Sequence, residues 1–283
     1  MPVTLSLVLI LVAYAIGVVR FMRRARSNPA PQMTRVLAMG AGILIIELAL
    51  ASPLDDLADH LLSAHMTQHL LLMLIAAPLL VWGRPTPYLV WFLPMPLRKG
   101  VAYLWNPLGV SQLIRFLKKP AMSWGAFCGT VLLWHVPAIY RWAVGGELRH
   151  ALMHLSFLGS GLLFWSVVLK TPRRRGFDYG SAGLFVFSAA LLTGLPGALI
   201  AFSRHPLYVD KRYGPVPYGL TALADQQLAG LIMWIPMDLF LFGVALALFA
   251  AALGVRRIDY GTRTVTASTS FHPIEEGKSV PHA

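Results

Sequence analysis

Long apolar stretches alternate with short polar ones along most of the chain. Runs of about 17 to 25 mainly apolar residues are long enough to cross the hydrocarbon core of a membrane as helices. Seven such spans are predicted, in chain order Val3–Val19, Val36–Ser52, His60–Trp82, Ala121–Arg141, His150–Leu169, Ser181–Ser203 and Asp225–Leu253. The pattern therefore predicts an all-α polytopic integral membrane protein, a seven-transmembrane-helix bundle.

The segment 84–119 interrupts this pattern. It is aromatic, broken by proline, and too short between its interruptions to span a membrane. We expect it to lie at the membrane interface, with a re-entrant element as the alternative. The spans form one transmembrane domain, residues 1–254, followed by a polar cytoplasmic tail, residues 255–283. No cleavable leader pattern precedes the first span, which we expect to be retained.

Composition agrees with a membrane protein. Hydrophobic residues make up 57% of the chain and charged residues 13%, against about 25% charged residues in a soluble domain. The single cysteine, Cys128, excludes disulfides within the chain and metal sites of the CxxC type. The net charge of +12 would suit nucleic acid, but the positions of the charges indicate otherwise.

The basic residues predict the orientation, because cytoplasmic loops carry an excess of Lys and Arg. With seven spans, one side holds Arg20, Arg23, Arg24, Arg26, Arg35, Arg84, Arg98, Lys99, Arg115, Lys118, Lys119, Lys170, Arg173–Arg175, Arg256, Arg257, Arg263 and Lys278. The other side holds Arg141, Arg149, Arg204, Lys211 and Arg212. We therefore predict an outside N-terminus and a cytoplasmic C-terminus, with contact to membrane lipid and none to nucleic acid.

Histidines recur near the predicted outer ends of three spans. At about 1.5 Å per helical residue, His65 and His69 lie roughly 7 and 13 Å below the outer interface, and His135 about 9 Å below it. His154 lies one turn inside the fifth span. Ionisable groups within a membrane are costly and mark functional sites by default. His60 is about 140° around the helix from His65, so we expect it to face the headgroups or the outer loop.

Imidazole and thioether groups without a thiolate suit a late transition metal such as copper, with zinc or iron as alternatives. The predicted metal ligands are His65, His69, His135 and His154. Predicted supporting residues are Asp225, Met66, Met73, His150 and Gln68. For each histidine, a hydrogen bond between helices is the alternative role. Asp225 either caps the seventh span or orients an imidazole, and Pro137 permits a bend beside His135.

Four strings of the sequence resemble the CtaG family of cytochrome c oxidase assembly factors, the polytopic family associated with caa-type oxidases. The strings are HMTQHLLLMLIAAPLLVWGRP (residues 65–85), LLWHVPAIY (132–140), ALMHLSFLGSGLLFW (151–165) and DQQLAGLIMWIP (225–236). They occur in this order and run from the third span to the seventh. The first span and the tail add nothing to the resemblance.

The resemblance implies a seven-helix protein of the bacterial inner membrane that matures the terminal oxidase at its copper centre. Its expected partners are cytochrome c oxidase subunits and an extracytoplasmic copper donor, and its expected cargo is Cu(I). No enzymatic motif is present, so we expect no enzyme. Two alternatives stay open. Histidines at equal depth on different helices also suit a heme-binding or heme-modifying protein. A metal permease is disfavoured because the cytoplasmic half of the spans lacks matching polar groups except Asp238, so no continuous pathway is evident.

Overall fold

The computed structural model describes residues 2–25, 30–105, 109–170, 177–208 and 219–268. Within these ranges the regular elements are α-helices and one π-helical segment, which confirms the predicted all-α class. They are α1 (Pro2–Ala25), α2 (Ala30–Leu50), α3 (Pro53–Ala58), α4 (Leu62–Leu70), η1 (Leu71–Ala76), α5 (Ala77–Gly83), α6 (Pro85–Phe92), α7 (Met95–Trp105), α8 (Val110–Leu117), α9 (Pro120–Trp134), α10 (Pro137–Val144), α11 (Glu147–Val168), α12 (Tyr179–Ala201) and α13 (Ala222–Ser268).

Six helical stretches of the described residues are long and apolar enough to cross a membrane, as expected of a multi-pass membrane protein. They are Thr4–Arg24, Gln32–Leu50, Leu62–Gly83, Glu147–Val168, Tyr179–Ala201 and Ala222–Gly254. These stretches correspond to all of the predicted spans except the fourth.

The fourth predicted span, Ala121–Arg141, is wrong as a continuous helix. The helix α9 ends at Trp134, α10 begins at Pro137, and the two are bent by 83°. Pro137 has no N–H to continue the helical hydrogen bonds, and its ring disfavours a helical conformation at the residue before it. Val136 is accordingly extended, with φ −69° and ψ 120°. A seventh span exists only if this bent pair is counted as one.

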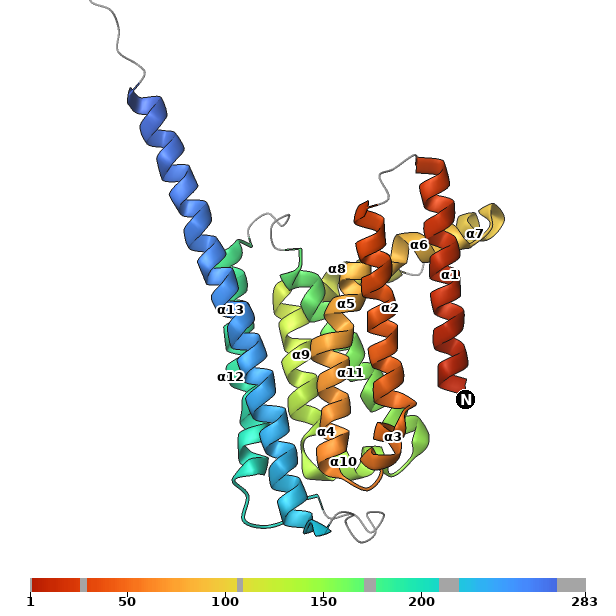
Figure 1. The fold of residues 1–283 in the computed structure, drawn as a ribbon, viewed down its shortest axis with the longest axis vertical. Coiled ribbons are helices and arrows are strands. Elements are labelled where there is room, and N and C mark those ends of the chain that lie inside the picture. Colours follow the sequence, from red (N-terminus) through yellow and green to blue (C-terminus); the bar gives the residue numbers. More distant parts are fainter. Residues whose placement is uncertain (1, 26–29, 106–108, 171–176, 209–218, 269–283) are drawn as a thin grey trace, which may run out of the picture.

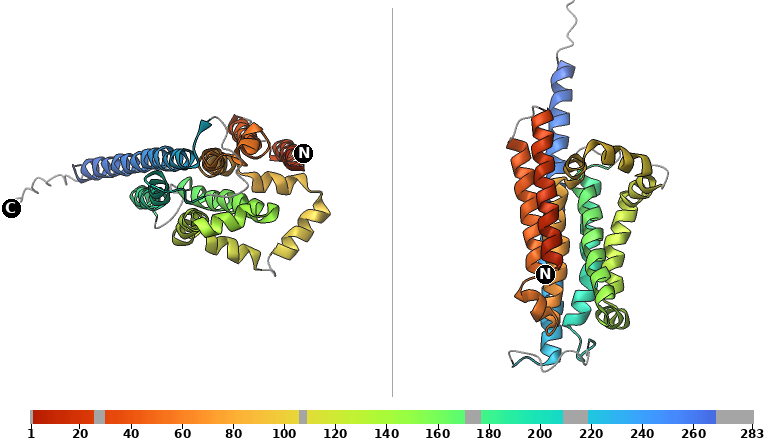
Figure 2. Two further views of the ribbon diagram at one scale, coloured as in Figure 1. Left: turned by 90° about the horizontal axis from the view of Figure 1, so that it is seen from below. Right: turned by 90° about the vertical axis from the view of Figure 1, so that its right-hand side faces the viewer.

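The third span, made of α4, η1 and α5, occupies the centre of the bundle. It packs against α2, α11 and α13, while α12 lies along α13 and α9 along α11 (Figures 1 and 2). Its middle turn, η1, is π-helical. There the indole Nε1 of Trp165 donates a hydrogen bond of 2.8 Å to the Met73 carbonyl. Such π-helical turns inside α-helices frequently accompany functional sites.

Small residues allow α12 and α13 to approach closely. A Cβ atom on Gly230 would lie 2.4 Å from the Ala201 nitrogen and 2.7 Å from the Gly197 carbonyl oxygen. Both neighbours are backbone atoms, which cannot rotate away. Glycine at these positions is therefore what permits backbone-to-backbone packing of the two helices.

The segment 84–119 forms the three short helices α6, α7 and α8, which lie across one end of the bundle (Figures 1 and 2). No helix in the described part of this segment is long enough to span a membrane. Arg84 adopts a left-handed conformation (φ 48°) and turns the chain from α5 into α6. The Arg35 guanidinium donates to the Tyr88 hydroxyl (3.0 Å), which ties α2 to this turn.

The helix α13 continues past the predicted domain boundary at residue 254. It runs to Ser268 and projects beyond the other helices in Figure 1. The predicted tail, residues 255–283, is therefore helical at its start. Its remainder, residues 269–283, lies outside the described residues.

The two ends of the bundle differ in charge. Where α1, α5 and α11 end and α2, α9 and α12 begin, the described chain carries Arg20, Arg23, Arg24, Arg35, Arg84, Arg98, Lys99, Arg115, Lys118, Lys119 and Lys170. The opposite end carries Arg141, Arg149 and Arg204. The charged residues Arg26, Arg173–Arg175, Lys211, Arg212 and Lys278, on which the orientation also rests, lie outside the described residues.

A candidate metal centre at one end of the bundle

The site is built on the first turns of α4. The residue before this helix, Leu61, has no side-chain acceptor for the unpaired N–H groups of the first turn. Asp225 of α13 supplies one. Its carboxylate accepts hydrogen bonds from the N–H groups of Leu62 (2.7 Å) and Ser63 (3.2 Å), and from the Ser63 hydroxyl (2.5 Å). A carboxylate also interacts favourably with the positive end of the helix dipole, so Asp225 fixes the start of α4.

The predicted role of Asp225 as the cap of its own helix is wrong. Thr221 caps α13 instead, because its hydroxyl accepts from the N–H of Ala224 (3.1 Å). The alternative role, a hydrogen bond to an imidazole, is also absent from the described residues. Asp225 supports the histidines indirectly, by holding the helix that carries His65 and His69.

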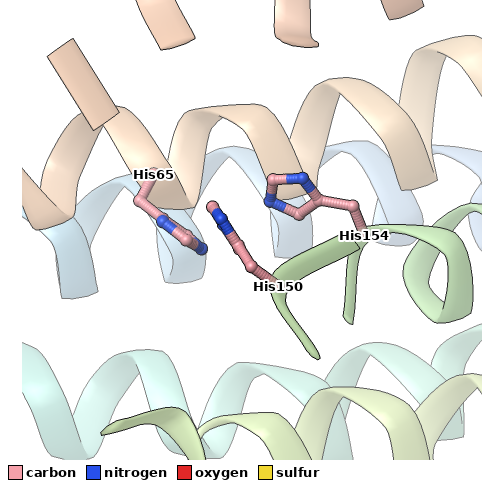
Figure 3. A group of neighbouring side chains, drawn as sticks. All are labelled: His65, His150 and His154. Atoms are coloured by element: carbon pink, nitrogen blue, oxygen red, sulfur yellow. The ribbon is translucent and has the colours of Figure 1, made fainter. Parts of the chain in front are cut away.

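Three histidines face one another across α4 and α11. Figure 3 shows His65 of α4 reaching toward His150 and His154 of α11. Ring centroids are 5.0 Å apart for His65 and His150, 4.4 Å for His150 and His154, and 5.4 Å for His65 and His154. One nitrogen of each ring lies within 4.8 Å of the others. Ligands bound tetrahedrally at about 2.0 Å are about 3.3 Å apart, so small side-chain rotations can bring these three nitrogens around one ion. The residues His65, His150 and His154 are called the histidine triad below.

His69 lies one turn further along α4 and is 4% exposed. Its ring centroid is 4.5 Å from that of His65 and 5.3 Å from that of His154, and it stacks on Phe157 at 4.0 Å. Both of its ring nitrogens are buried without a hydrogen-bond partner among the described residues, as are the Nε2 atoms of His65 and His154. Buried polar atoms are nearly always paired. This group of unpaired nitrogens therefore fits a site that receives a cation.

His135 lies beside this cluster, in the bend between α9 and α10. Its Nδ1 is 2.6 Å from the Val131 carbonyl oxygen, and its Nε2 is 3.2 Å from the Met66 sulfur. Its ring centroid is 6.1 Å from that of His69. The structure thus brings the four predicted ligands together, but it places His135 next to His69 and Met66 and outside the histidine triad.

His150, predicted only as a supporting residue at the interface, belongs to the triad. The short helices α3 and α10 pack against the starts of α4 and α11, so the residue is half-buried. The position of His150 at the predicted outer end of the fifth span does not show that other helices pack over it. The four-residue spacing of His150 and His154 was the signal that places both rings on one helix face.

Asp55 of α3 is an associated residue that the sequence did not single out. It interacts electrostatically with His150, and its carboxylate accepts a hydrogen bond from Gln68 Nε2 (2.8 Å). Burial raises the pKa of Asp55 above its usual value, while Gln68 and His150 act in the opposite direction. The acidic pair Asp55–Asp56 just before the histidine-bearing helix was the available signal.

The other predicted supporting residues take different positions. Gln68 donates to the Ala49 carbonyl (2.6 Å) as well as to Asp55, so it links α4 to α2 and α3 rather than to an imidazole. Met73 is buried in the apolar core within η1. His60 is exposed, with Nδ1 2.9 Å from the Asp56 carbonyl oxygen, and it lies apart from the site as expected.

The donor set consists of imidazoles and one thioether. The single cysteine, Cys128, is buried in α9 and takes no part in the cluster. Neutral imidazole suits copper, zinc and iron, and thioether favours Cu(I) among them. The chemistry that this arrangement supports is binding of a single late transition-metal ion near one end of the bundle.

The chain matches one protein-family model, that of the cytochrome c oxidase caa3 assembly factor (Caa3_CtaG), over residues 12–254. The match includes every histidine of the site and all the membrane-crossing helices except the start of α1. Neither the curated proteins nor the solved structures contain a match.

Proposed function

Because this chain belongs to the family of cytochrome c oxidase caa3 assembly factors, we propose that it binds copper at the histidine triad and passes it to an oxidase subunit during assembly. The observation that carries the proposal is the convergence of His65, His150 and His154, each offering a nitrogen within 4.8 Å of the others. Copper is a cargo in this proposal, and the protein is a carrier rather than an enzyme.

The environment of the triad favours a weakly hydrated monovalent ion. The three residues of the triad are all imidazoles, and His65 and His154 are buried. Burying a charge in apolar surroundings is expensive, and the cost is lower for one charge than for two. Cu(I) with neutral imidazole ligands keeps the net charge of the site at one, which supports Cu(I) over Zn(II).

Access to the triad is through its least buried member. His150 is half-buried, whereas His65 and His154 are buried. We place the first contact with an extracytoplasmic copper donor at His150, with the acidic Asp55 beside it to attract the incoming cation. The gathering of basic residues at the opposite end supports the orientation in which the histidine end faces outside and the protein spans the bacterial inner membrane.

Heme and transport are the competing functions. Heme iron also accepts imidazole ligands, but three rings packed 4.4 to 5.4 Å apart are better matched to a single small ion than to a macrocycle. For transport, Asp238 would have to extend a polar path from the site, yet its carboxylate packs against Gly194 of α12, and its Oδ1 is buried with no hydrogen-bond partner among the described residues.

The test is the metal content and visible spectrum of the purified protein, together with maturation of the oxidase in cells. We expect about one copper ion per chain at the triad, and loss of both copper and mature oxidase in the His65→Ala/His154→Ala variant. The matched control is His60→Ala, an exposed histidine near the start of the same span.

Three outcomes contradict the proposal. A Soret band with stoichiometric heme assigns the histidines to iron. Unchanged copper content in the double variant places the metal elsewhere. Full oxidase maturation by the double variant makes the triad structural.

A further inference from the structure

His135 and Met66 form a pair that the histidine triad does not use. His135 is 7% exposed and Met66 is 1% exposed, and Nε2 of the ring lies 3.2 Å from the thioether sulfur. The two come from different spans, α4 and the bend after α9. Their contact is therefore a product of the fold rather than of local helix geometry.

The hydrogen bond made by Nδ1 of His135 determines whether Nε2 faces the sulfur with a proton or with a lone pair. Nδ1 is 2.6 Å from the Val131 carbonyl oxygen, and a carbonyl oxygen only accepts hydrogen bonds. The proton of the neutral ring is therefore on Nδ1, and Nε2 carries a lone pair. This arrangement, with one ring nitrogen bonded to a backbone carbonyl and the other free, is the usual one for a metal-ligating histidine.

Two lone pairs thus face each other across 3.2 Å, because a thioether sulfur has no hydrogen to donate. A cation bound between the two atoms would turn this contact into two metal–ligand bonds. A metal bonded to nitrogen at about 2.0 Å and to sulfur at about 2.3 Å spans this distance with an angle of about 95° at the metal. A small side-chain adjustment opens that angle to the tetrahedral value.

His69 lies between this pair and the triad. Its ring centroid is 6.1 Å from that of His135 on one side, and 4.5 and 5.3 Å from those of His65 and His154 on the other. Its nitrogens have no hydrogen-bond partner among the described residues. A neutral imidazole has one free nitrogen, so His69 can serve one of the two positions at a time.

We propose that Met66 Sδ and His135 Nε2 form a second, Cu(I)-selective subsite, to which His69 carries the ion from the histidine triad by ligand exchange. The proposal rests on the proposed copper function and adds a direction of movement along α4. Copper stays monovalent throughout: one metal–nitrogen bond at the triad breaks as a bond at the Met66–His135 subsite forms. Thioether ligation excludes Zn(II) from this subsite, because zinc prefers nitrogen, thiolate and oxygen ligands.

The experiment is anaerobic titration of the detergent-solubilised full chain with Cu(I) against a chromophoric chelator, followed by X-ray absorption spectroscopy of the loaded protein. We expect a metal–sulfur shell beside the metal–nitrogen shell in the wild type. Met66→Leu, a volume-conserving change, removes the sulfur shell and weakens Cu(I) binding by about tenfold or more. Met73→Leu, a buried methionine two turns further along the same span, leaves both unchanged.

A second variant separates this proposal from the proposed function. His65→Ala/His154→Ala, which removes the triad, should lack the copper acquired in cells, because that copper enters through the triad. Loaded directly with Cu(I) in the titration, the same variant should keep the sulfur shell of the Met66–His135 subsite. If the wild type binds Cu(I) through nitrogen alone and Met66→Leu behaves like the wild type, the subsite does not exist and the triad proposal stands. If the wild type binds no Cu(I), both proposals fail.

Discussion

At the scale of single residues, the carboxylate of Asp225 holds the start of the helix that carries His65 and His69. It is 4% exposed and accepts three hydrogen bonds from Leu62 and Ser63 at the start of α4. A buried donor left without its acceptor costs about 1–3 kcal/mol. No other side chain near Leu61 accepts from this helix end among the described residues.

Asp225→Asn should therefore lower the thermal unfolding midpoint of the detergent-solubilised protein and weaken copper binding together. The asparagine keeps the shape of the side chain, but its amide nitrogen meets N–H groups that need an acceptor. The expected loss is about 1–3 kcal/mol of stability. Intrinsic tryptophan fluorescence measures the midpoint, and the chelator titration measures the affinity.

Asp59→Asn is the matched control, because Asp59 is exposed near the same end of the bundle. Its midpoint should stay close to that of the wild type. Equal midpoints for Asp225→Asn and the wild type would show that the cap does not stabilise α4.

The candidate residues could be predicted from sequence where the spacing of residues along a helix determines which face their side chains share. His65 and His69, four residues apart, share a face, and so do His150 and His154. The direction of the His135 ring could not be predicted, because it depends on the Val131 carbonyl in the last turn of α9. Asp225 was recognised as polar and near a helix start, but which helix it caps is a property of the tertiary fold.

At the scale of elements, the close contact between α12 and α13 makes a specific prediction. Gly230→Ala places a methyl group against the backbone of Ala201 and Gly197, at 2.4 and 2.7 Å. Since backbone atoms cannot rotate away, the two helices must separate. Overpacking of this kind costs about 1–3 kcal/mol or more, and the thermal midpoint should fall accordingly.

Gly243→Ala tests whether the effect comes from packing. A Cβ atom on Gly243 would meet nothing within 4 Å, and alanine is the better helix former by about 1 kcal/mol. This variant should be as stable as the wild type or more stable. A fall in midpoint of the same size in both variants would refute the packing explanation.

The ends of helices could be predicted where the amino-acid composition changes from apolar to polar. A bend or a π-helical turn inside an apolar run could not be predicted, because the composition does not change there. The apolar runs located six spans within a few residues, because hydrocarbon thickness sets a minimum length. The proline at 137 indicated a bend, but the run of apolar residues up to Tyr140 hid how sharp it is. Nothing in the aliphatic string of η1 distinguishes a π-helical turn from an α-helical one.

At the scale of the whole molecule, the orientation predicted from the basic residues can be measured directly. Cys128 is the only cysteine and is 1% exposed, so the wild type provides an unlabelled background. Leu148, at the histidine end, and Leu97, in α7 at the basic end, are both exposed. In spheroplasts, a membrane-impermeant maleimide should label Leu148→Cys, and should label Leu97→Cys only after lysis.

The reverse labelling pattern would place the histidines on the cytoplasmic side and remove the extracytoplasmic donor from the proposal. Labelling of both variants in intact spheroplasts would mean that the two residues do not lie on opposite sides. The wild-type chain, denatured and then labelled, controls for the reactivity of Cys128.

The overall architecture followed from simple regularities, whereas the content of the site did not. Alternating spans place the starts of α4 and α11 and the end of α9 at one end of the bundle, so their histidines had to lie at similar depth. How α3 and α10 cover that end, and which rings then meet, depends on packing among side chains from distant parts of the chain.

The histidine site and the basic residues lie at opposite ends of the bundle, and this separation has an electrical consequence. Moving one charge across the whole membrane involves about 2.3 kcal/mol per 100 mV of potential. With the basic end in the cytoplasm, a cation that enters near the outer end and leaves sideways to a neighbouring subunit crosses only a small part of that potential. Copper loading by the proposed route should then require no coupling to the proton-motive force, and the copper content should be the same in energised and de-energised membranes.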